Sequence, residues 1–193
     1  MLVLAVVTAL SSAPLCAERL LEETVIADMD WEPLRAIPLN EQDRACRQCG
    51  GRFADPLAGV DLSQSPTEAD VEVYADDTEV TEAELLFEGN VSLKQGYRQV
   101  TADQVTADRA RETATANGNV VFREPGILIR GSRIDYNSQS EEATVTDARY
   151  VIHDRRMVGS AVQLKRLGNG EIAIDDGRMT YCSPEDPEWI LYA

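Results

Sequence analysis

Basic residues are scarce in this chain of 193 residues, and long apolar runs are absent. It has 18 Lys and Arg against 34 Asp and Glu, which gives a net charge of −16 at pH 7. Binding to phosphate backbones requires a basic patch, so this charge argues against nucleic acid as a partner. No apolar stretch reaches the roughly 20 residues that a membrane-spanning helix needs. We therefore expect a solvated acidic surface and no helix of that kind.

Motifs for catalysis and metal binding are also missing. The sequence has no Gly-rich phosphate loop and no H-E-x-x-H zinc motif. Acidic doublets such as Asp76-Asp77 lack the D-x-D-x-D-G spacing of a calcium loop, so solvated turns are their expected role. The single histidine, His153, has no nucleophile motif beside it. We expect no enzyme activity, no metal and no cofactor.

Residues 1–17 resemble a secretory signal peptide. Residues 2–10 form an apolar run of the right length, and mostly small residues follow as far as Ala17, after which we expect cleavage. No basic residue precedes the run, so a buried N-terminal strand is an alternative. A lipoprotein anchored through Cys16 is another. Export is the favoured interpretation.

Residues 18–73 have the composition of an irregular arm or linker. Pro and Gly recur in this stretch and no helix or strand period persists. Its one motif is Cys46-x-x-Cys49. A redox pair would need a βαβ context, and a zinc site would need a second cysteine pair, so a structural disulfide is favoured. After signal removal Cys46, Cys49 and Cys182 are odd in number, which leaves a free thiol or a bond to another chain.

A repeat organises residues 74–193. Gly89-Asn90-Val91 returns 29 residues later as Gly118-Asn119-Val120, and Ala148 and Gly177 follow at steps of 30 and 29. A fixed period of this size indicates stacked units, none of which can bury its apolar face alone.

Apolar and polar residues alternate within the repeat, as they do in residues 143–146 and 172–175, and this is the strand signal. Turn-forming residues separate the expected strands. They stand at Gln95-Gly96, Asn117-Gly118, Pro125-Gly126, Asn137-Ser138 and Gly168-Asn169-Gly170. Short strands with such turns predict an all-β fold, either a sandwich, a jelly roll or a solenoid.

The chain ends inside another expected strand. Trp189, Leu191 and Ala193 share one strand parity, and no turn follows them. An unpaired apolar strand at the end of a finished protein would invite aggregation. We therefore expect the sequence to continue in a longer protein.

Three stretches together resemble the periplasmic N-terminal domain of the LptD family of lipopolysaccharide-assembly proteins, also called organic solvent tolerance proteins. They are residues 49–56 (CGGRFADP), the Ala-Asp and Gly-Asn-Val repeat, and residues 179–184 (MTYCSP) ahead of Trp189. The repeat by itself is shared with the wider lipopolysaccharide-transport group, which includes the bridge protein LptA. The two cysteine contexts point to the LptD branch. The resemblance covers residues 31–193.

This resemblance implies a V-shaped antiparallel β-jelly roll of stacked repeat units, LptA/OstA-like, whose apolar interior accepts the acyl chains of lipopolysaccharide. Open edges would join LptA-type jelly rolls by strand addition. Beyond this sequence, an outer-membrane barrel plugged by the lipoprotein LptE would receive the lipid. Disulfides to that barrel are implied for Cys49 and Cys182, with Cys46 as an alternative partner. The expected location is the periplasmic face of the outer membrane.

The same resemblance assigns alternating apolar residues of the repeat to a lipid-binding groove. They are Phe87, Val91, Leu93, Val120, Phe122, Ile127, Ile129, Ile134, Tyr136, Val145, Ile172, Ile174 and Met179. Without the resemblance, a closed core is the simpler role of alternating apolar residues. Two alternatives therefore stay open: a structural β-scaffold without a ligand, and a stand-alone periplasmic bridge subunit like LptA.

Overall fold

The structure is a computed structural model, and it describes residues 28–42, 50–63, 65–181 and 190–192. Apart from one 3-10 turn, every regular element in this part of the chain is a strand. The elements are β1 (Trp31–Pro33), η1 (Leu34–Ala36), β2 (Gly51–Phe53), β3 (Val71–Tyr74), β4 (Asp77–Val80), β5 (Glu84–Gln95), β6 (Arg98–Asp108), β7 (Thr113–Glu124), β8 (Ile127–Asn137), β9 (Glu142–Ile152), β10 (Met157–Arg166), β11 (Ile172–Thr180) and β12 (Leu191–Tyr192).

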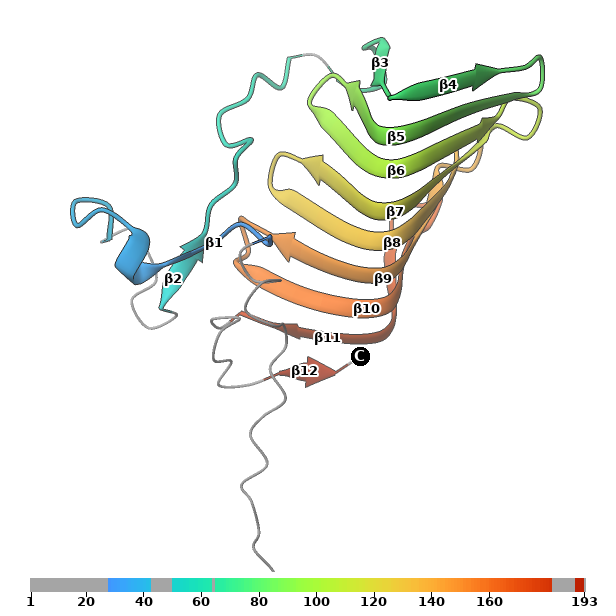
Figure 1. The fold of residues 1–193 in the computed structure, drawn as a ribbon. Coiled ribbons are helices and arrows are strands. Elements are labelled where there is room, and N and C mark those ends of the chain that lie inside the picture. The colour runs from blue at the N-terminus through green and yellow to red at the C-terminus, as the bar shows by residue number, and fades with distance from the viewer. Residues whose placement is uncertain (1–27, 43–49, 64, 182–189, 193) are drawn as a thin grey trace, which may run out of the picture.

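Ten of these strands form one antiparallel sheet, in which neighbours along the chain from β4 onward lie side by side (Figure 1). The order is β12-β11-β10-β9-β8-β7-β6-β5-β3, and β4 also pairs with β5. Short turns favour this order, because a connection of a few residues can join only antiparallel strands. The predicted all-β fold of stacked antiparallel strands is confirmed. The strands are longer than expected, since β5 to β11 each have 9–12 residues.

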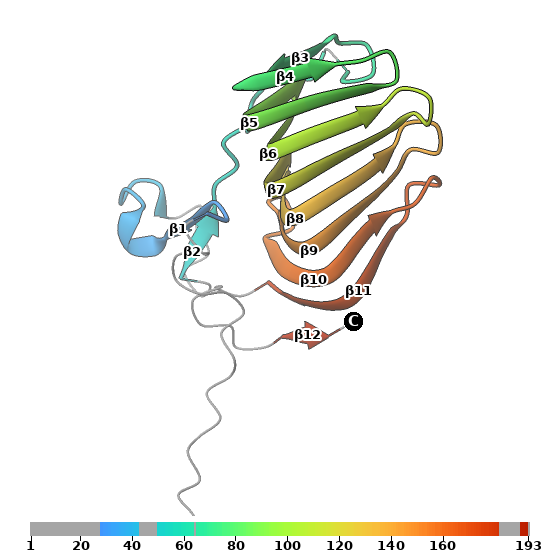
Figure 2. The ribbon, with the colours of Figure 1, turned by 45° about the vertical axis from the view of Figure 1, so that its right-hand side comes forward.

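A bend near the middle of the long strands folds the sheet into a V (Figure 2). In β7 the pairing register shifts between Asn117 and Val120, as it does at a β-bulge. The turn predicted at Asn117-Gly118 is therefore wrong, because this pair lies inside β7 and bends it. Turns and bulges both use residues that tolerate positive φ, so the sequence signal is the same. Positive φ recurs every 29 residues, at Gly89, Gly118, Asp147 and Asp176.

The inner face of the V carries two clusters of apolar side chains. One cluster lies mainly on β5 to β7 and is centred on Val91, Val105 and Val120. The second lies on β8 to β11. Phe87 and Leu93 stand on opposite sides of the bend in β5, yet both pack against the first cluster. The two halves of the bent sheet therefore face each other across the bend.

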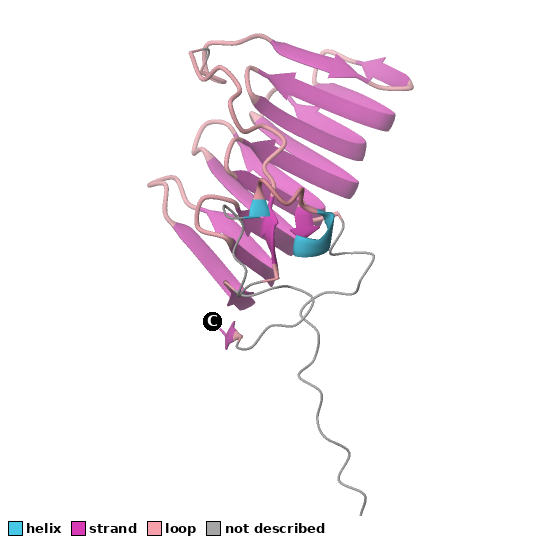
Figure 3. Ribbon diagram, turned by 90° about the vertical axis from the view of Figure 1, so that its left-hand side faces the viewer, coloured by secondary structure: helices cyan, strands magenta, loops and turns pink. Residues whose placement is uncertain are grey.

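The outer face of the sheet carries a third cluster, which the N-terminal arm covers (Figure 3). Leu128, Val151 and Val158 of β8, β9 and β10 pack there against Met29, Trp31 and Phe53. In the arm, β1 and β2 pair over three residues each, and the Trp31 and Phe53 rings lie 4.8 Å apart. The segment predicted to be irregular thus contains a small two-stranded sheet, because these side chains need a partner surface. The main sheet begins at Val71, near the predicted boundary at residue 74.

Candidate functional site

Strand register aligns the apolar side chains of the inner face into rows that cross the strands. In the first row, each residue is the register partner of the next: Leu93, Val100, Phe122, Ile129, Tyr150, Gly159, Met179 and Leu191. The second row, beyond the bend, is Phe87, Val105, Ala116, Ile134, Val145, Leu164 and Ile174. Two nearly continuous apolar rows therefore flank the bend.

Burial on the inner face is nearly complete at the bend and uneven away from it, where Tyr150 and Val145 are also buried. Val91, Val120 and Ala148, which lie at the bend, are each 1% exposed. Farther out, side chains such as Ile129 and Ile174 are only half-buried. Folding alone does not cover this apolar surface, so a ligand that covers it gains free energy from the hydrophobic effect.

All the residues predicted to line a lipid groove occupy inner-face positions. Most of them belong to the two inner clusters: Phe87, Val91, Leu93, Val120, Ile129, Ile134, Val145, Ile174 and Met179. The remaining four, Phe122, Ile127, Tyr136 and Ile172, take inner positions through the alternation of their strands. Their contact with a lipid stays a prediction.

Several inner-face residues were missed by the sequence analysis. Val100 and Val105 are five residues apart in β6, so simple alternation would place them on opposite faces. A register shift between Thr101 and Gln104 returns them to the same face. Tyr150 was missed for a different reason: its strand shows alternation, but nothing in the local pattern singles out its hydroxyl group.

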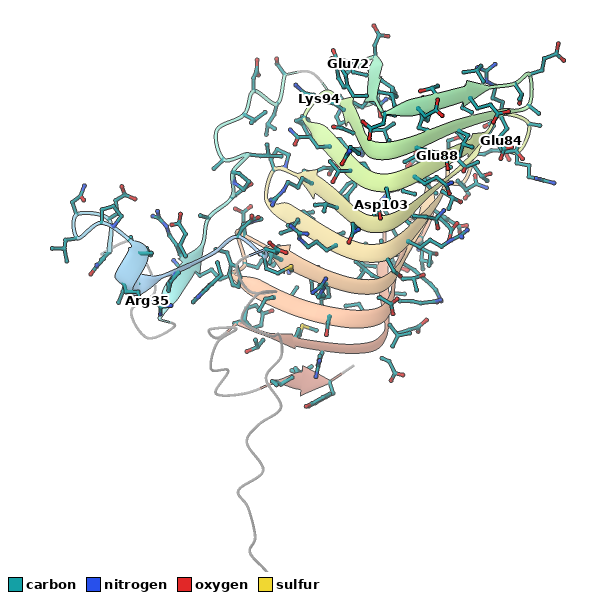
Figure 4. All side chains as sticks on the ribbon, in the orientation of Figure 1. Arg35, Glu72, Glu84, Glu88, Lys94 and Asp103 are labelled. Atoms are coloured by element: carbon teal, nitrogen blue, oxygen red, sulfur yellow. The ribbon has the colours of Figure 1, made fainter. Side chains whose placement is uncertain are left out.

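Polar side chains form hydrogen bonds at the bend, on its outer side. They form hydrogen-bonded pairs between neighbouring segments of the sheet: Asn90 Nδ2 to Asp76 (2.7 Å), Asn119 Nδ2 to Asp103 (2.9 Å) and Ser132 Oγ to Asp147 (2.7 Å). Further acidic side chains, including Glu84 and Glu88, are exposed on β5 (Figure 4). The outer side of the bend is therefore polar and the inner side apolar.

A hollow of about 770 Å³ lies on the polar side of the bend. Arg130, Arg149 and Arg178 line it together with Asp147 and Asp176. Side chains of both charges would have to be desolvated by an apolar ligand, at a high cost in free energy. We therefore place the candidate lipid site on the apolar inner face and not in this hollow.

The arm is held to the sheet by buried charges as well as by its apolar side chains. Arg123 of β7 donates two hydrogen bonds to Asp30, at 2.5 and 2.8 Å, and His153 Nε2 lies 3.1 Å from the same carboxylate. Burial alone would raise the pKa of Asp30, but the hydrogen bonds from His153 and Arg123 outweigh it and lower that pKa. Burial alone would lower the pKa of His153, but the hydrogen bond with Asp30 and the nearby Asp55 help to raise it. Arm and sheet are thus electrostatically coupled.

No group of three or more His, Cys, Asp and Glu side chains is placed to hold a metal ion in the described part of the chain. Within the same ranges, no helix has both the length and the apolar character needed to cross a membrane. Residues 1–17 and the cysteines Cys46, Cys49 and Cys182 lie outside the described residues. The signal peptide and the disulfides therefore stay predictions.

A bent antiparallel sheet of stacked strands with a partly uncovered apolar inner face places the protein among the β-jelly rolls. A family model described as "LptA/(LptD N-terminal domain) LPS transport protein" matches residues 70–167. The chain belongs to this family. The resemblance identified from the sequence is thereby confirmed.

Relatives of known name agree with this assignment. The chain is 32% identical over 144 residues to LPS-assembly protein LptD of Saccharophagus degradans, a match that covers 74% of this chain and 17% of the relative. It is 30% identical over 167 residues to LptD of Chromohalobacter salexigens, covering 84% and 19%. The chain thus matches less than a fifth of the length of either relative.

A solved structure supports the fold. The crystal structure of LptH, the LptA homologous periplasmic component of the lipopolysaccharide transport device from Pseudomonas aeruginosa, superposes with a TM-score of 0.50. The match covers 57% of this chain and 85% of that chain, at 18% sequence identity. Because the sequence identity is low, this similarity is evidence for the fold alone.

Proposed function

We propose that this chain is a lipopolysaccharide-transport module whose inner face holds the acyl chains of the lipid. The observation that carries the proposal is the pair of apolar rows that flank the bend, in which side chains such as Phe87, Ile129 and Ile174 are only half-buried. Membership of the transport family supports lipopolysaccharide as that lipid. Transport of this kind makes and breaks no covalent bond, so it needs no catalytic residue.

Apolar burial has the properties that a conduit requires. Each buried methylene contributes about 0.8 kcal/mol, so a few acyl chains are held firmly. The hydrophobic effect is also non-directional, so it does not fix a chain at one position along a row. Lipid held in this way can be displaced along the rows by lipid that arrives behind it.

Both ends of the sheet suit the addition of a partner strand. β3 and β4 lie at one end of the described sheet and β12 at the other. Tyr74 and Val80 at the first end are 67% and 61% exposed. Edge strands bind extended partners through backbone hydrogen bonds.

We infer that one end meets an LptA-type jelly roll and the other leads toward an outer-membrane barrel with its lipoprotein LptE. This arrangement requires export, for which residues 1–17 are the expected signal. It places the domain at the periplasmic face of the outer membrane, with Cys49 and Cys182, and Cys46 as an alternative, available to form disulfides with the barrel.

Site-specific photocrosslinking in cells tests the conduit directly. A photoreactive residue at Ile129 would stand among the inner cluster, whereas its neighbour Leu128 is 0% exposed and packs beneath the arm. We expect a lipopolysaccharide adduct at Ile129 and none at Leu128. Adducts at neither position in folded, exported protein would favour the closed scaffold without a ligand. Equal adducts at both would show that the inner face does not select the lipid.

A further inference from the structure

Tyr150 is the one member of the first inner row with a hydroxyl group, and its register partner Gly159 is the one member without a side chain. A Cβ atom added at Gly159 would clash with the Cζ and Oη atoms of Tyr150. The phenol ring therefore extends from β9 over β10, and the glycine leaves room for it. Tyr150 thus puts a polar atom into an otherwise apolar row.

The Tyr150 hydroxyl is buried and has no hydrogen-bond partner among the described residues. The residue is 4% exposed and belongs to the inner cluster of β8 to β11. An unpaired buried hydroxyl costs about 1–3 kcal/mol, and phenylalanine would fill nearly the same space without that cost. Buried polar groups in native proteins are nearly always paired, so this one calls for a functional explanation.

The protonation state makes this hydroxyl a donor. Burial, with a smaller contribution from Tyr181, raises the pKa of Tyr150 above its ordinary value of 10.0. The group therefore keeps its proton at neutral pH and can donate a hydrogen bond to an oxygen atom. Carbonyl oxygens are good acceptors and need no charge.

We propose that Tyr150 donates a hydrogen bond to a lipid that carries a carbonyl oxygen beside its apolar chain, as an ester or amide linkage does. This inference rests on the proposed function. The rows hold an acyl chain without fixing where it stops, whereas a single donor in the first row creates one preferred position. That position lies toward the β12 end of the sheet, where Met179 and Leu191 complete the row.

The cluster that contains Tyr150 also contains two flexible methionine side chains. Met157 and Met179 pack in the same cluster. Methionine has three rotatable bonds and a polarisable sulfur atom, so it adapts readily to a new neighbour. A lipid would therefore reach the hydroxyl by displacing side chains of this cluster.

Two matched lipids and two matched variants test the hydrogen bond in the full chain. A monoacylglycerol carries an ester carbonyl, and the alkyl glycerol ether of equal chain length does not. We expect Tyr150→Phe to weaken binding of the ester about three- to tenfold and to leave binding of the ether unchanged. Tyr97→Phe removes a hydroxyl from a half-buried position in the turn between β5 and β6, outside both apolar rows, and should change neither. Equal effects on ester and ether would overturn the proposal.

Thermal stability supplies an independent readout on the same variant. Tyr150→Phe should raise the Tm of the lipid-free protein by roughly 2–4 °C, because it removes an unpaired buried hydroxyl. A fall in Tm would show that the hydroxyl has a structural partner and would overturn the proposal.

Binding of purified lipopolysaccharide separates this proposal from the conduit. If the wild-type chain binds lipopolysaccharide while Tyr150→Phe keeps full affinity for the ester, the proposed hydrogen bond is wrong and the proposed lipid conduit is supported. If the wild-type chain binds neither lipopolysaccharide nor the ester, both fail.

Discussion

At the level of single residues, the attachment of the arm depends on one carboxylate. Asp30 pairs with both Arg123 and His153, and their side chains are only 13%, 19% and 4% exposed. Loss of one partner from such a buried group leaves the others without compensation. The same burial makes the attachment sensitive to pH.

The pH dependence of stability should reveal this group. Because the pKa of His153 is raised, its contribution is fully present below its ordinary value of 6.5 and is lost as pH rises through the folded-state value. Asp30 has a lowered pKa, so its contribution is present above 3.8 and is lost on acidification. We expect the free energy of unfolding to fall as the pH rises above 6.5, through the raised pKa of His153. His153→Gln should lower that free energy by about 1–2 kcal/mol at pH 6 and remove this slope.

Urea denaturation of both proteins across this pH range measures the effect. An unchanged slope in His153→Gln would assign the pH dependence to other groups.

At the level of elements, the V depends on a bend in the long strands, which coincides with register shifts in the β5–β6, β6–β7 and β7–β8 pairs. Gly118 has a φ of +72°, and a Cβ atom added there would clash with the Asp103 carboxylate. That carboxylate accepts the hydrogen bond from Asn119. Backbone conformation and side-chain pairing at the bend are therefore linked.

Substitutions at two glycines with similar φ angles separate the cost of backbone strain from the cost of the clash with Asp103. Gly170 has a φ of +82° and no atom within 4 Å of an added Cβ. Gly170→Ala should therefore cost only the strain of a positive φ, about 1 kcal/mol. Gly118→Ala adds the clash with Asp103 and should cost about 2–4 kcal/mol. Chemical denaturation measures the free energy of unfolding of both variants. Equal losses of stability would show that the bend relaxes around the added methyl group.

The arm is a second element whose packing can be tested. Met29 is 0% exposed between the arm and the sheet, whereas Leu39 is 84% exposed. Met29→Ala should destabilise the arm by about 2–4 kcal/mol, and Leu39→Ala should stay within about 0.5 kcal/mol. Hydrogen exchange at β1 and β2 reports the docked state. Unchanged protection in Met29→Ala would mean that charged contacts alone hold the arm.

At the level of the whole molecule, the two ends of the sheet differ. β4 carries the exposed Val80 at one end, and β12 carries the exposed Leu191 at the other. Unlike ends that pair head to tail form open chains of molecules. The net charge of −16 opposes such association through repulsion between molecules. The association should therefore strengthen as added salt screens this repulsion.

A charge placed on one end should block this association. Lysine side chains on edge strands discourage pairing with another sheet. We expect Val80→Lys to weaken self-association at least about tenfold, given the cost of burying an unpaired charge. Val162→Lys, at a site that is 53% exposed in the interior strand β10, should have little effect. Sedimentation velocity at several concentrations measures both, and equal behaviour would argue against pairing through β4.

Much of the fold could be predicted because strands leave a local signature. The alternation around Ile129 predicts opposite faces for Ile129 and Leu128, and they lie in different clusters on opposite faces. The V shape and the lipid were expected from the family resemblance and not from spacing. The bulges were harder to predict, since the Gly-Asn pairs that produce them are equally typical of turns.

The sequence by itself determined the strand character of the repeat, which residues share a face along each straight run, and the period of 29–30 residues, because all three are written in local patterns of residues. Only the tertiary structure decided that the arm covers Leu128 on the outer face, through contacts such as Arg123 with Asp30, 93 residues apart. It also decided that the Tyr150 hydroxyl lies buried without a described partner. Both outcomes depend on groups that are distant in the chain and that no local pattern brings together.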